Sequence, residues 1–408
     1  YLGTVQDDVS GASRANPRGV LVSQGQTAAA YDPGRLALGQ TYYWRIDEVN
    51  SAPDSTIFTG DVWSFTVEPV AERIAQVTVT ASSANSAGEG PENTINGSGL
   101  SAAGLHTEEN KAMWLSSITG PQPTWIQYEF DRPYKLHQIQ VWNYNSTTEP
   151  VIGYGIKEAT IAFSTDGVNW TPLGTTHELA RGPGMPGYAA NTIVDAGGAT
   201  AQFVKITAHN NWGGIVSQFG LSEVRFLSLP VTAREPYPAA GATAVEAALT
   251  LRWRAGREAA RHEVYLSTEE ASVREGTTPP ATVSDPCYAC SLDLARTYYW
   301  RVDEVNEAEV PSRWQGQVWS FSTQEYIVVD DFESYNAIEA GAEGSHLVYE
   351  TWSDGFGTTT NGSIIGYADR PPMETANVCD GKQSVPLFYD NTAAANSEVT
   401  AAVADLPA

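Results

Sequence analysis

Residues 125–145 carry the most regular alternation of polar and apolar positions in the chain. In residues 125–130 one face takes Trp125, Gln127 and Glu129, and the other takes Ile126, Tyr128 and Phe130. The alternation resumes at residues 134–145 after Asp131-Arg132-Pro133, which we expect to form a turn. A period of two that is rich in aromatic and β-branched residues predicts two antiparallel strands. Trp142 and the asparagines after it stand where the second strand runs into a loop, and loops on a β scaffold commonly carry binding groups.

An internal repeat frames this region. Residues 41–50 read TYYWRIDEVN and residues 297–306 read TYYWRVDEVN, an offset of 297 − 41 = 256 that also carries residues 63–65 onto 319–321. Two separated copies of one β module are therefore present. Alternation predicts that Tyr42, Trp44 and Ile46 point inward, and that Tyr43, Arg45 and Asp47 point outward. The adjacent Asp47-Glu48 and Asp303-Glu304 pairs would face opposite sides of a strand, so we do not expect them to form a catalytic carboxylate pair.

Turn signals and strand patterns divide the chain into four β regions. Residues 160–170 (TIAFSTDGVNW) predict a hairpin whose Asp166-Gly167 supplies the positive φ of the turn. We expect an all-β protein of antiparallel β-sandwiches in tandem. The predicted domains are residues 1–68, 73–229, 231–324 and 326–408.

Charge and composition exclude several classes of partner. The 408 residues include 48 acidic and 23 basic side chains, for a formal charge of −25. An acidic surface repels nucleic acid and anionic membranes, so neither is expected as a partner. No apolar run reaches the length of a membrane span. Abundant Trp and Tyr, few Cys, and a first residue that falls inside a strand-like run lead us to expect a segment of a longer secreted or cell-surface chain.

Motif searches return no enzyme signature. Residues 182–187 (GPGMPG) fit a phosphate-loop pattern by letter, but two prolines remove amide donors and no helix is expected to follow. Cys287 and Cys290 lack the second ligand pair of a zinc site. A local disulfide or two reduced thiols remain the alternatives for them. We expect no catalytic residues in this segment.

The central region resembles a discoidin (F5/8 type C, galactose-binding-like) domain. The resemblance is carried, in the family's order, by ENTINGSGL (92–100), MWLSS (113–117), residues 125–145, GIKEATIAFSTDGVNWTPLG (155–174), FVKITA (203–208) and LSEVRF (221–226). It covers residues 73–229 and implies an eight-stranded jelly roll with a ligand site in loops at one rim.

The flanking regions carry weaker resemblances. Residues 1–68 and 231–324 resemble fibronectin type III domains. The resemblance implies that Trp253 is a core tryptophan. It also implies that Tyr298, and Tyr42 in the first copy, form a tyrosine corner. Residues 326–408 resemble the opening half of a jelly-roll carbohydrate-binding or laminin-G-like domain. The fibronectin-like copies are expected to be spacers without a ligand.

The discoidin resemblance implies a structural Ca²⁺. The family's metal loop aligns with residues 96–101 (NGSGLS), and the acidic residue from the last strand aligns with Glu223. Asn96, Ser98, Ser101 and Glu223 would then supply oxygen ligands of the kind that Ca²⁺ prefers. Asn96 stands where the family has Asp, which removes one charge, and a glycine-rich turn without metal is the alternative.

The same resemblance implies a glycan site at the rim, where aromatic rings face a sugar and amides bond its hydroxyls. The candidate residues are His106, Glu108, Trp114, Trp142, Asn143, Asn145, Asn210, Asn211 and Trp212. Asn145 falls near the place of the family's rim Arg, which is missing. For Trp114 and Trp142, packing into the core is the alternative, and Trp212 is expected to be the most exposed.

We therefore expect an extracellular carbohydrate-binding or adhesion segment whose partner is a polysaccharide or glycoconjugate. One alternative is a structural stalk or a protein-binding adhesin without glycan binding. Another is a set of accessory modules of an enzyme whose catalytic domain lies outside this sequence.

Overall fold

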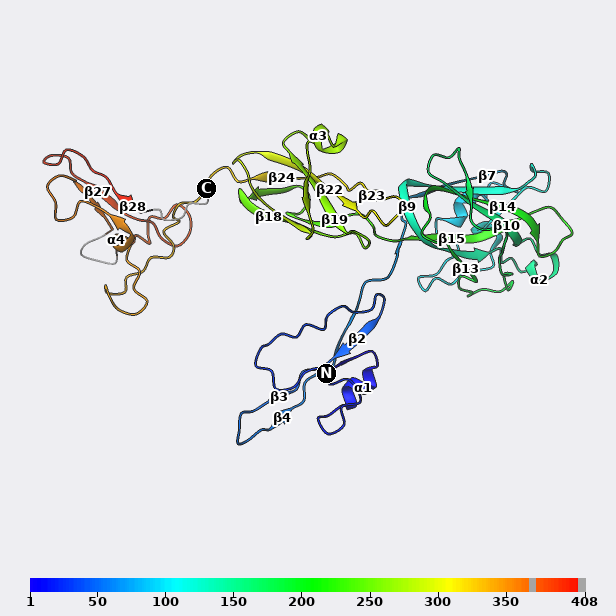
Figure 1. Cartoon of the computed structure of the whole chain (residues 1–408), viewed down its shortest axis with the longest axis horizontal. Helices are drawn as coiled ribbons and strands as arrows, with labels where there is room; N and C mark the ends of the chain where they lie inside the picture. The colour runs from blue at the N-terminus through cyan, green and yellow to red at the C-terminus, as the bar shows by residue number, and fades with distance from the viewer. Residues whose placement is uncertain (367–371, 403–408) are drawn as a thin grey trace. The chain divides into compact units, whose positions relative to one another are not determined.

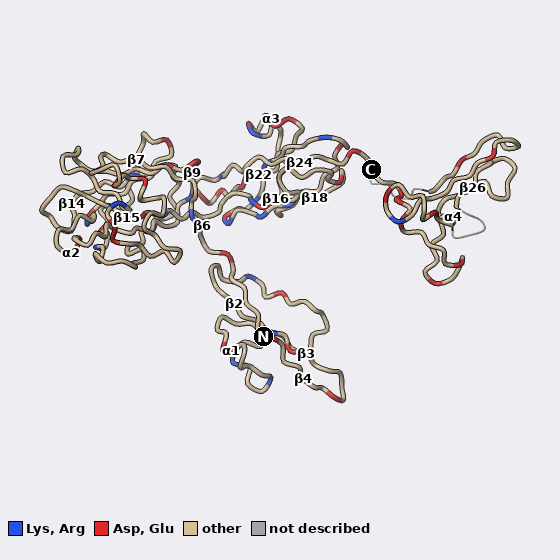
Figure 2. The backbone as a smooth tube through the Cα atoms, turned by 180° about the vertical axis from the view of Figure 1, so that it is seen from behind, with Lys and Arg blue, Asp and Glu red and all other residues tan. Residues whose placement is uncertain are grey.

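The computed structural model describes residues 1–366 and 372–402, and strands dominate its secondary structure (Figure 1). The chain divides into two compact units, Tyr1–Val231 and Thr232–Ala408. Most strand pairs are antiparallel, which confirms the all-β prediction. Acidic residues are dispersed along the backbone rather than gathered in one run (Figure 2).

The central domain of the first unit is built around one long strand, β9 (Trp125–Asn143). Its strands follow the order β11-β10-β14-β9-β15-β6, with β12 on β10, β8 on β15, and β7 and β13 on β9. The other elements are β6 (Glu72–Arg73), β7 (Val77–Ala81), η1 (Pro91–Thr94), η2 (Asn110–Ala112), β8 (Trp114–Leu115), α2 (Glu149–Ile152), β10 (Ile156–Ser164), β11 (Thr171–Pro172), β12 (His177–Glu178), β13 (Thr192–Asp195), β14 (Thr200–Asn211) and β15 (Gly220–Ser228).

The turn predicted at residues 131–133 is wrong, because β9 runs through it without a break. The first half of β9 pairs with β7 and β14, and its second half pairs with β13 and β15. Pro133 is exposed and lies where the register of the β9–β14 pair shifts, so its missing amide costs no regular ladder bond. The chain therefore bends from one half of the domain to the other while staying extended.

The predicted alternation is confirmed in the first half of β9, but in the second half Lys135 and Leu136, and then Val141 to Asn143, are buried in succession. Ile126, Tyr128 and Phe130 are buried, and the edge of the Tyr128 ring packs against Phe226 with the ring centroids 4.9 Å apart. The predicted Asp166-Gly167 turn is also present, with Gly167 at φ 73°. The core of the domain contains Ile74, Trp114, Leu136, Ile139, Val141, Ile156, Ile161, Val204, Ile206, Leu221 and Val224 in addition to these rings.

The first repeat copy holds a three-stranded sheet of order β1-β2-β5 and a separate hairpin. Its elements are β1 (Leu2–Gly3), α1 (Gln6–Gly11), β2 (Thr41–Trp44), β3 (Glu48–Val49), β4 (Ile57–Phe58) and β5 (Trp63–Thr66). The hydroxyl of Tyr42 accepts a bond from the Ala37 amide at 3.1 Å. In the second copy, the hydroxyl of Tyr298 accepts one from the Asp293 amide at 3.0 Å. Both tyrosines thus make the local backbone bond expected of a tyrosine corner.

The second copy is a sandwich of two sheets, β16-β18-β21 and β17-β24-β22-β19-β20, with β23 on β22. Leu251 and Trp253 from the first sheet pack with Val264, Trp300 and Val302 from the second in one core. The elements are β16 (Arg234–Tyr237), β17 (Ala242–Val245), β18 (Ala248–Arg254), β19 (Arg261–Ser267), α3 (Glu270–Glu275), β20 (Ala281–Val283), β21 (Cys287–Ser291), β22 (Thr297–Val305), β23 (Arg313–Trp314) and β24 (Trp319–Thr323).

Arg45 is buried and Ile46 is exposed, so the predicted orientations of these two residues are wrong. The Arg45 guanidinium bonds the Asp47 carboxylate and the carbonyls of Val9, Ser10 and Ala12 at the end of α1. In the second copy, Arg301 bonds Asp303 and the carbonyl of Arg274 in α3 in the same way. A fully bonded guanidinium can be buried, and a pattern of alternation alone cannot show that its partners exist.

Cys287 and Cys290 are free thiols at two positions of β21. They are three residue steps apart along the strand, which puts their Cα atoms about 10 Å apart and their side chains on opposite faces. The predicted alternative of a local disulfide is therefore excluded, since a bridge needs Cα atoms within about 7 Å.

The described part of residues 326–408 contains two two-stranded sheets, β25–β28 and β26–β27, around Tyr335, Val348, Ile365 and Met373. Its elements are α4 (Val348–Thr351), β25 (Trp352–Ser353), β26 (Ser363–Ile365), β27 (Leu387–Tyr389) and β28 (Thr400–Ala401). Residues 367–371 and 403–408 of this predicted domain lie outside the described residues. The jelly-roll assignment for this region stays a prediction.

Candidate functional site

Three asparagines predicted to bond a sugar are buried instead, and their amides are used by the protein. The Asn143 side chain donates to the carbonyls of Ile156 and Ala180 at 2.7 and 2.8 Å. Asn145 donates to the carbonyls of Thr107 and Met185, and accepts from the Gly184 amide at 2.7 Å. Asn211 joins the two ends of its own loop through the carbonyls of Val216 and Gln218. The structure contradicts a direct role for these three residues, because they are buried and the side-chain NH₂ group of each already donates to two backbone acceptors.

Trp114, Trp142 and His106 are buried as well. The indole nitrogen of Trp114 donates to the Ser83 carbonyl at 3.0 Å, and that of Trp142 to the Gly104 carbonyl at 3.1 Å. Burial lowers the pKa of His106, although the bond between its Nδ1 and the Thr107 carbonyl opposes this effect. The two indoles belong to the packed interior, and the prediction that these three residues line an open rim is wrong.

Glu108, Asn210 and Trp212 remain accessible among the predicted residues. Trp212 is half-buried, and its indole nitrogen donates to the Leu179 carbonyl at 3.0 Å. This bond fixes the orientation of the ring while one part of it stays open to solvent. Asn210 is exposed at the end of β14, where its side-chain nitrogen lies 2.6 Å from a carboxylate oxygen of Glu158.

Two neighbours of these residues were missed by the sequence reasoning. The Lys157 ammonium lies 5.2 Å from the centre of the Trp212 ring, and the Asn210 amide oxygen accepts from the Glu158 backbone at 3.0 Å. His209, beside them, bonds Thr160 at 2.5 Å. We call Lys157, Glu158, His209, Asn210 and Trp212 the rim cluster. The pairing of β10 with β14 brings these residues together. The register of this pair is irregular at Glu158, and this bulge is visible only in the structure.

Glycines allow the loops behind the rim cluster to touch. Gly153 has φ 71°, and its carbonyl accepts from the Gly213 amide at 2.9 Å. A Cβ on Gly213 would lie 1.5 Å from the Ile152 carbonyl oxygen. Only glycine fits there, so the backbone next to Trp212 is held against the loop that follows α2.

The Glu149 side chain holds that loop in place through hydrogen bonds in the interior of the domain. Its fully buried carboxylate accepts the amides of Tyr154 and Gly155 at 2.8 and 3.1 Å, and the Arg181 Nε lies 3.9 Å away. Burial raises the pKa of Glu149 to about 7, against the opposing effect of these partners. Below that pH the carboxyl is neutral and still accepts both amides.

The predicted calcium ligands do not form a donor set that fits Ca²⁺. The Glu223 carboxylate already contacts the Arg225 Nε at 3.3 Å and the Arg73 guanidinium at 3.7 Å. The Asn96 amide oxygen accepts from the Ser98 backbone, and the Ser101 hydroxyl accepts from the Leu105 backbone. Two guanidinium groups beside a single carboxylate leave the site positive, whereas Ca²⁺ needs anionic oxygens. In the described residues no three His, Cys, Asp or Glu side chains gather into a metal site.

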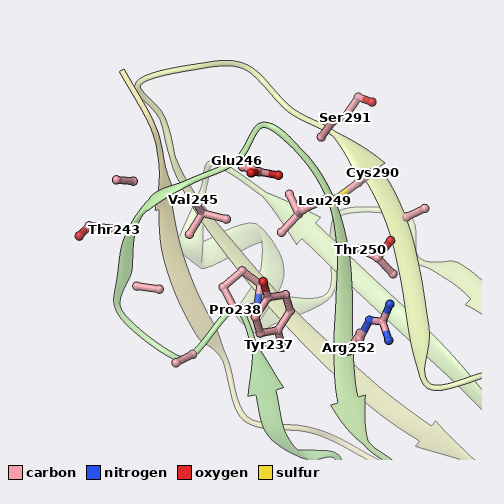
Figure 3. Close-up of a pocket in the computed structure, with 15 residues that line it drawn as sticks. Tyr237, Pro238, Thr243, Val245, Glu246, Leu249, Thr250, Arg252, Cys290 and Ser291 are labelled. Carbon is pink, nitrogen blue, oxygen red and sulfur yellow. The ribbon is translucent and has the colours of Figure 1, made fainter. Parts of the chain in front are cut away.

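A groove of about 880 Å³ lies elsewhere, in the second copy (Figure 3). Tyr237, Arg252, Glu246 and Leu249 line it, together with the half-buried Cys290. Burial raises the pKa of this thiol to about 11, so it is protonated at neutral pH. None of the predicted site residues contributes to the groove.

Comparison with known proteins places a domain within the chain. Residues 78–219 match the family model of the F5/8 type C domain, which agrees with the resemblance seen in the sequence. No curated protein matches the chain.

Several solved structures are similar to the chain. A family 89 glycoside hydrolase from Clostridium perfringens is 18% identical with a TM-score of 0.28, over 38% of this chain and 14% of that one. CBM32-3 from a family 31 glycoside hydrolase of the same organism is 20% identical with a TM-score of 0.30, over 39% of this chain and 95% of that one. The family 32 CBM of C. perfringens NanJ, solved with galactose, is 17% identical with a TM-score of 0.27, over 39% of this chain and 100% of that one.

Proposed function

We propose that this chain is a carbohydrate-binding segment of a secreted or cell-surface protein, and that it contacts a polysaccharide or glycoconjugate through the rim cluster. Two observations carry the proposal: the half-buried Trp212 ring, whose centre lies 5.2 Å from the Lys157 ammonium, and the bonded Glu158–Asn210 pair of the same two segments. An indole face packs on the C–H face of a pyranose, while the amide and carboxylate bond its hydroxyls. The match of residues 78–219 to an F5/8 type C domain supports the proposal.

The rim cluster is small and open, so a single site should bind weakly. A millimolar Kd corresponds to about −4.1 kcal/mol. Adhesion through such sites requires several of them on one particle, where effective concentration raises the avidity. None of the helices in the described residues is long and apolar enough to span a bilayer.

A glycan array probed with the complete 408-residue chain tests the proposal. Trp212→Ala should remove binding to the neutral glycans that are found, and Asn210→Ala should weaken it severalfold. Trp314→Ala is the matched control, because Trp314 is a half-buried tryptophan of the second copy, outside the rim cluster. Circular dichroism of each variant separates lost binding from lost folding.

The array also distinguishes the alternatives. A chain that binds no glycan would be a stalk or a protein-binding adhesin. If the Trp212→Ala chain binds a neutral glycan as well as the wild-type chain does, the site for that glycan lies outside the rim cluster. Binding to the substrate of a neighbouring catalytic domain would favour accessory modules of an enzyme.

A further inference from the structure

The outer face of the sheet formed by β7, β9, β14 and β10 carries a row of polar side chains on β7, β9 and β14. Gln127 of β9 pairs with Thr80 of β7 and with Lys205 of β14, and Lys205 pairs in turn with Ala162 of β10. These positions alternate with the buried Ile126, Tyr128, Val204 and Ile206, so their side chains stand on the solvent side.

Two tryptophans flank the lysine in the middle of this row. The Lys205 ammonium lies 4.1 Å from the centre of the Trp170 ring and 5.5 Å from that of the Trp125 ring. Trp170 comes from the turn before β11 and Trp125 begins β9, so two distant segments supply the rings. Both indoles and the lysine are half-buried. Ala162, the β10 residue that pairs with Lys205, contributes only a methyl group to this face.

Lys205 has no acidic partner within the part of the chain that the structure describes: its ammonium takes part in two ring contacts and in no ion pair. Stacking on two rings holds the ammonium in place without neutralising it, because the ring faces offer only a quadrupole.

We propose that this sheet face is a second saccharide site, selective for polysaccharides whose sugars carry carboxylates. The two indoles supply apolar faces for pyranose rings, and Gln127, Thr80 and Thr207 supply an amide and hydroxyls for the sugar hydroxyl groups. The carboxylate of a uronic acid pairs with the Lys205 ammonium, whose position is already fixed by the rings, so little side-chain entropy is lost on binding. The site does not depend on the function of the rim cluster.

A galacturonate oligomer and its methyl ester test the proposal, because they share a backbone and differ in charge. The complete chain should bind the acid at least tenfold more tightly than the ester by calorimetry or affinity electrophoresis. Lys205→Met should abolish that preference, and Trp170→Ala should weaken the binding of both oligomers.

Lys157→Met is the matched control, since Lys157 also lies over a tryptophan ring of the same domain, but in the rim cluster. It should leave the preference for the acid unchanged, and so should Trp212→Ala. Equal binding of acid and ester, or an unchanged preference in a folded Lys205→Met chain, would overturn the proposal. A preference lost in Lys157→Met or Trp212→Ala but kept in Lys205→Met would assign the acid to the rim cluster instead.

Discussion

Glu149 is the residue whose ionisation most directly affects the loops of the central domain. Its pKa in the folded chain is about 7, against an ordinary value of 4.5. Between these values the folded state keeps a proton that the unfolded state has lost, so stability falls as pH rises from about 4.5 to about 7. At 1.36 kcal/mol for each pH unit, the loss is on the order of 3 kcal/mol.

Glu149→Gln should remove this pH dependence. The amide oxygen of glutamine still accepts from Tyr154 and Gly155 and carries no charge that must be desolvated. Urea unfolding followed by tryptophan fluorescence at pH 5 and pH 7.5 measures the effect. An unfolding free energy that rises with pH in the wild-type chain, relative to Glu149→Gln, would contradict the assignment.

Glu223 leads to a prediction about metal. Burial raises its pKa, while Arg225 and Arg73 lower it. Since the guanidinium groups already neutralise this carboxylate, removal of Ca²⁺ with a chelator should leave the melting temperature of the chain unchanged. Glu223→Ala should lower stability by about 1–3 kcal/mol, because it removes the buried carboxylate that accepts from the Arg225 guanidinium and the Gly97 amide. A drop in melting temperature with chelator, reversed by added Ca²⁺, would show that the residues bind the metal after all.

The buried asparagines show what the sequence could predict about the site and what it could not. Their position at the ends of strands was predictable, because alternation located β9 and its last residues. Their role was not, since an amide bonds a backbone carbonyl as readily as a sugar hydroxyl. Which partner it meets depends on loops distant in sequence, such as residues 180–185 next to Asn143 and Asn145. Trp212 remained accessible because its loop turns at Gly213 and Gly214.

At the scale of elements, the short helices α1 and α3 are attached to the sheets by one buried arginine each. Arg301 bonds the Arg274 carbonyl of α3 and the Asp303 carboxylate. Its guanidinium also stacks on Tyr265, with Cζ 4.4 Å from the centre of the ring. Arg45 stacks on Tyr1 in the same way, with its Cζ 4.6 Å from the centre of the ring. Both copies of the repeat therefore keep one arrangement, which explains why Arg and Asp recur at matching positions.

Arg301→Met should destabilise the second copy by about 3–5 kcal/mol, because it leaves the buried Asp303 carboxylate without its cation. The double variant with Asp303→Asn should recover part of the loss. Arg252→Met is the control on an exposed arginine of the same copy, and should change stability by less than about 0.5 kcal/mol. Calorimetric unfolding of the complete chain measures all three, and an equal effect of the two single arginine variants would refute the role of Arg301.

At the scale of the whole molecule, the two repeat copies differ in what covers their sheets. Ile46, Trp63 and Phe65 are 47%, 47% and 40% exposed in the first copy. Their counterparts Val302, Trp319 and Phe321 are 0%, 6% and 1% exposed, beneath the sheet that contains β18. Among the described residues, no counterpart of the sheet β16-β18-β21 covers this face of the first copy, and uncovered apolar faces promote association.

Trp63→Thr combined with Phe65→Thr should reduce self-association of the chain with little change in stability, because threonine suits an exposed strand. The equivalent pair, Trp319→Thr with Phe321→Thr, should unfold the second copy, since each large-to-small change in a core costs about 3–5 kcal/mol. Sedimentation velocity and calorimetry measure the two effects. Unchanged self-association in the first variant would mean that this face contributes nothing to it.

Strand β9 also determines when the central domain can fold during synthesis. Its partners come from residues 77–81, which precede it, and from residues 192–211 and 220–228, which follow it. As the chain leaves the ribosome, β9 emerges long before the strands that complete its two halves. Pairing between such distant segments is slow and leaves apolar strand faces uncovered in the meantime. A nascent chain that stops short of β15 thus cannot bury Ile139, Val141 and Phe130, and the domain forms only once residue 228 has been released.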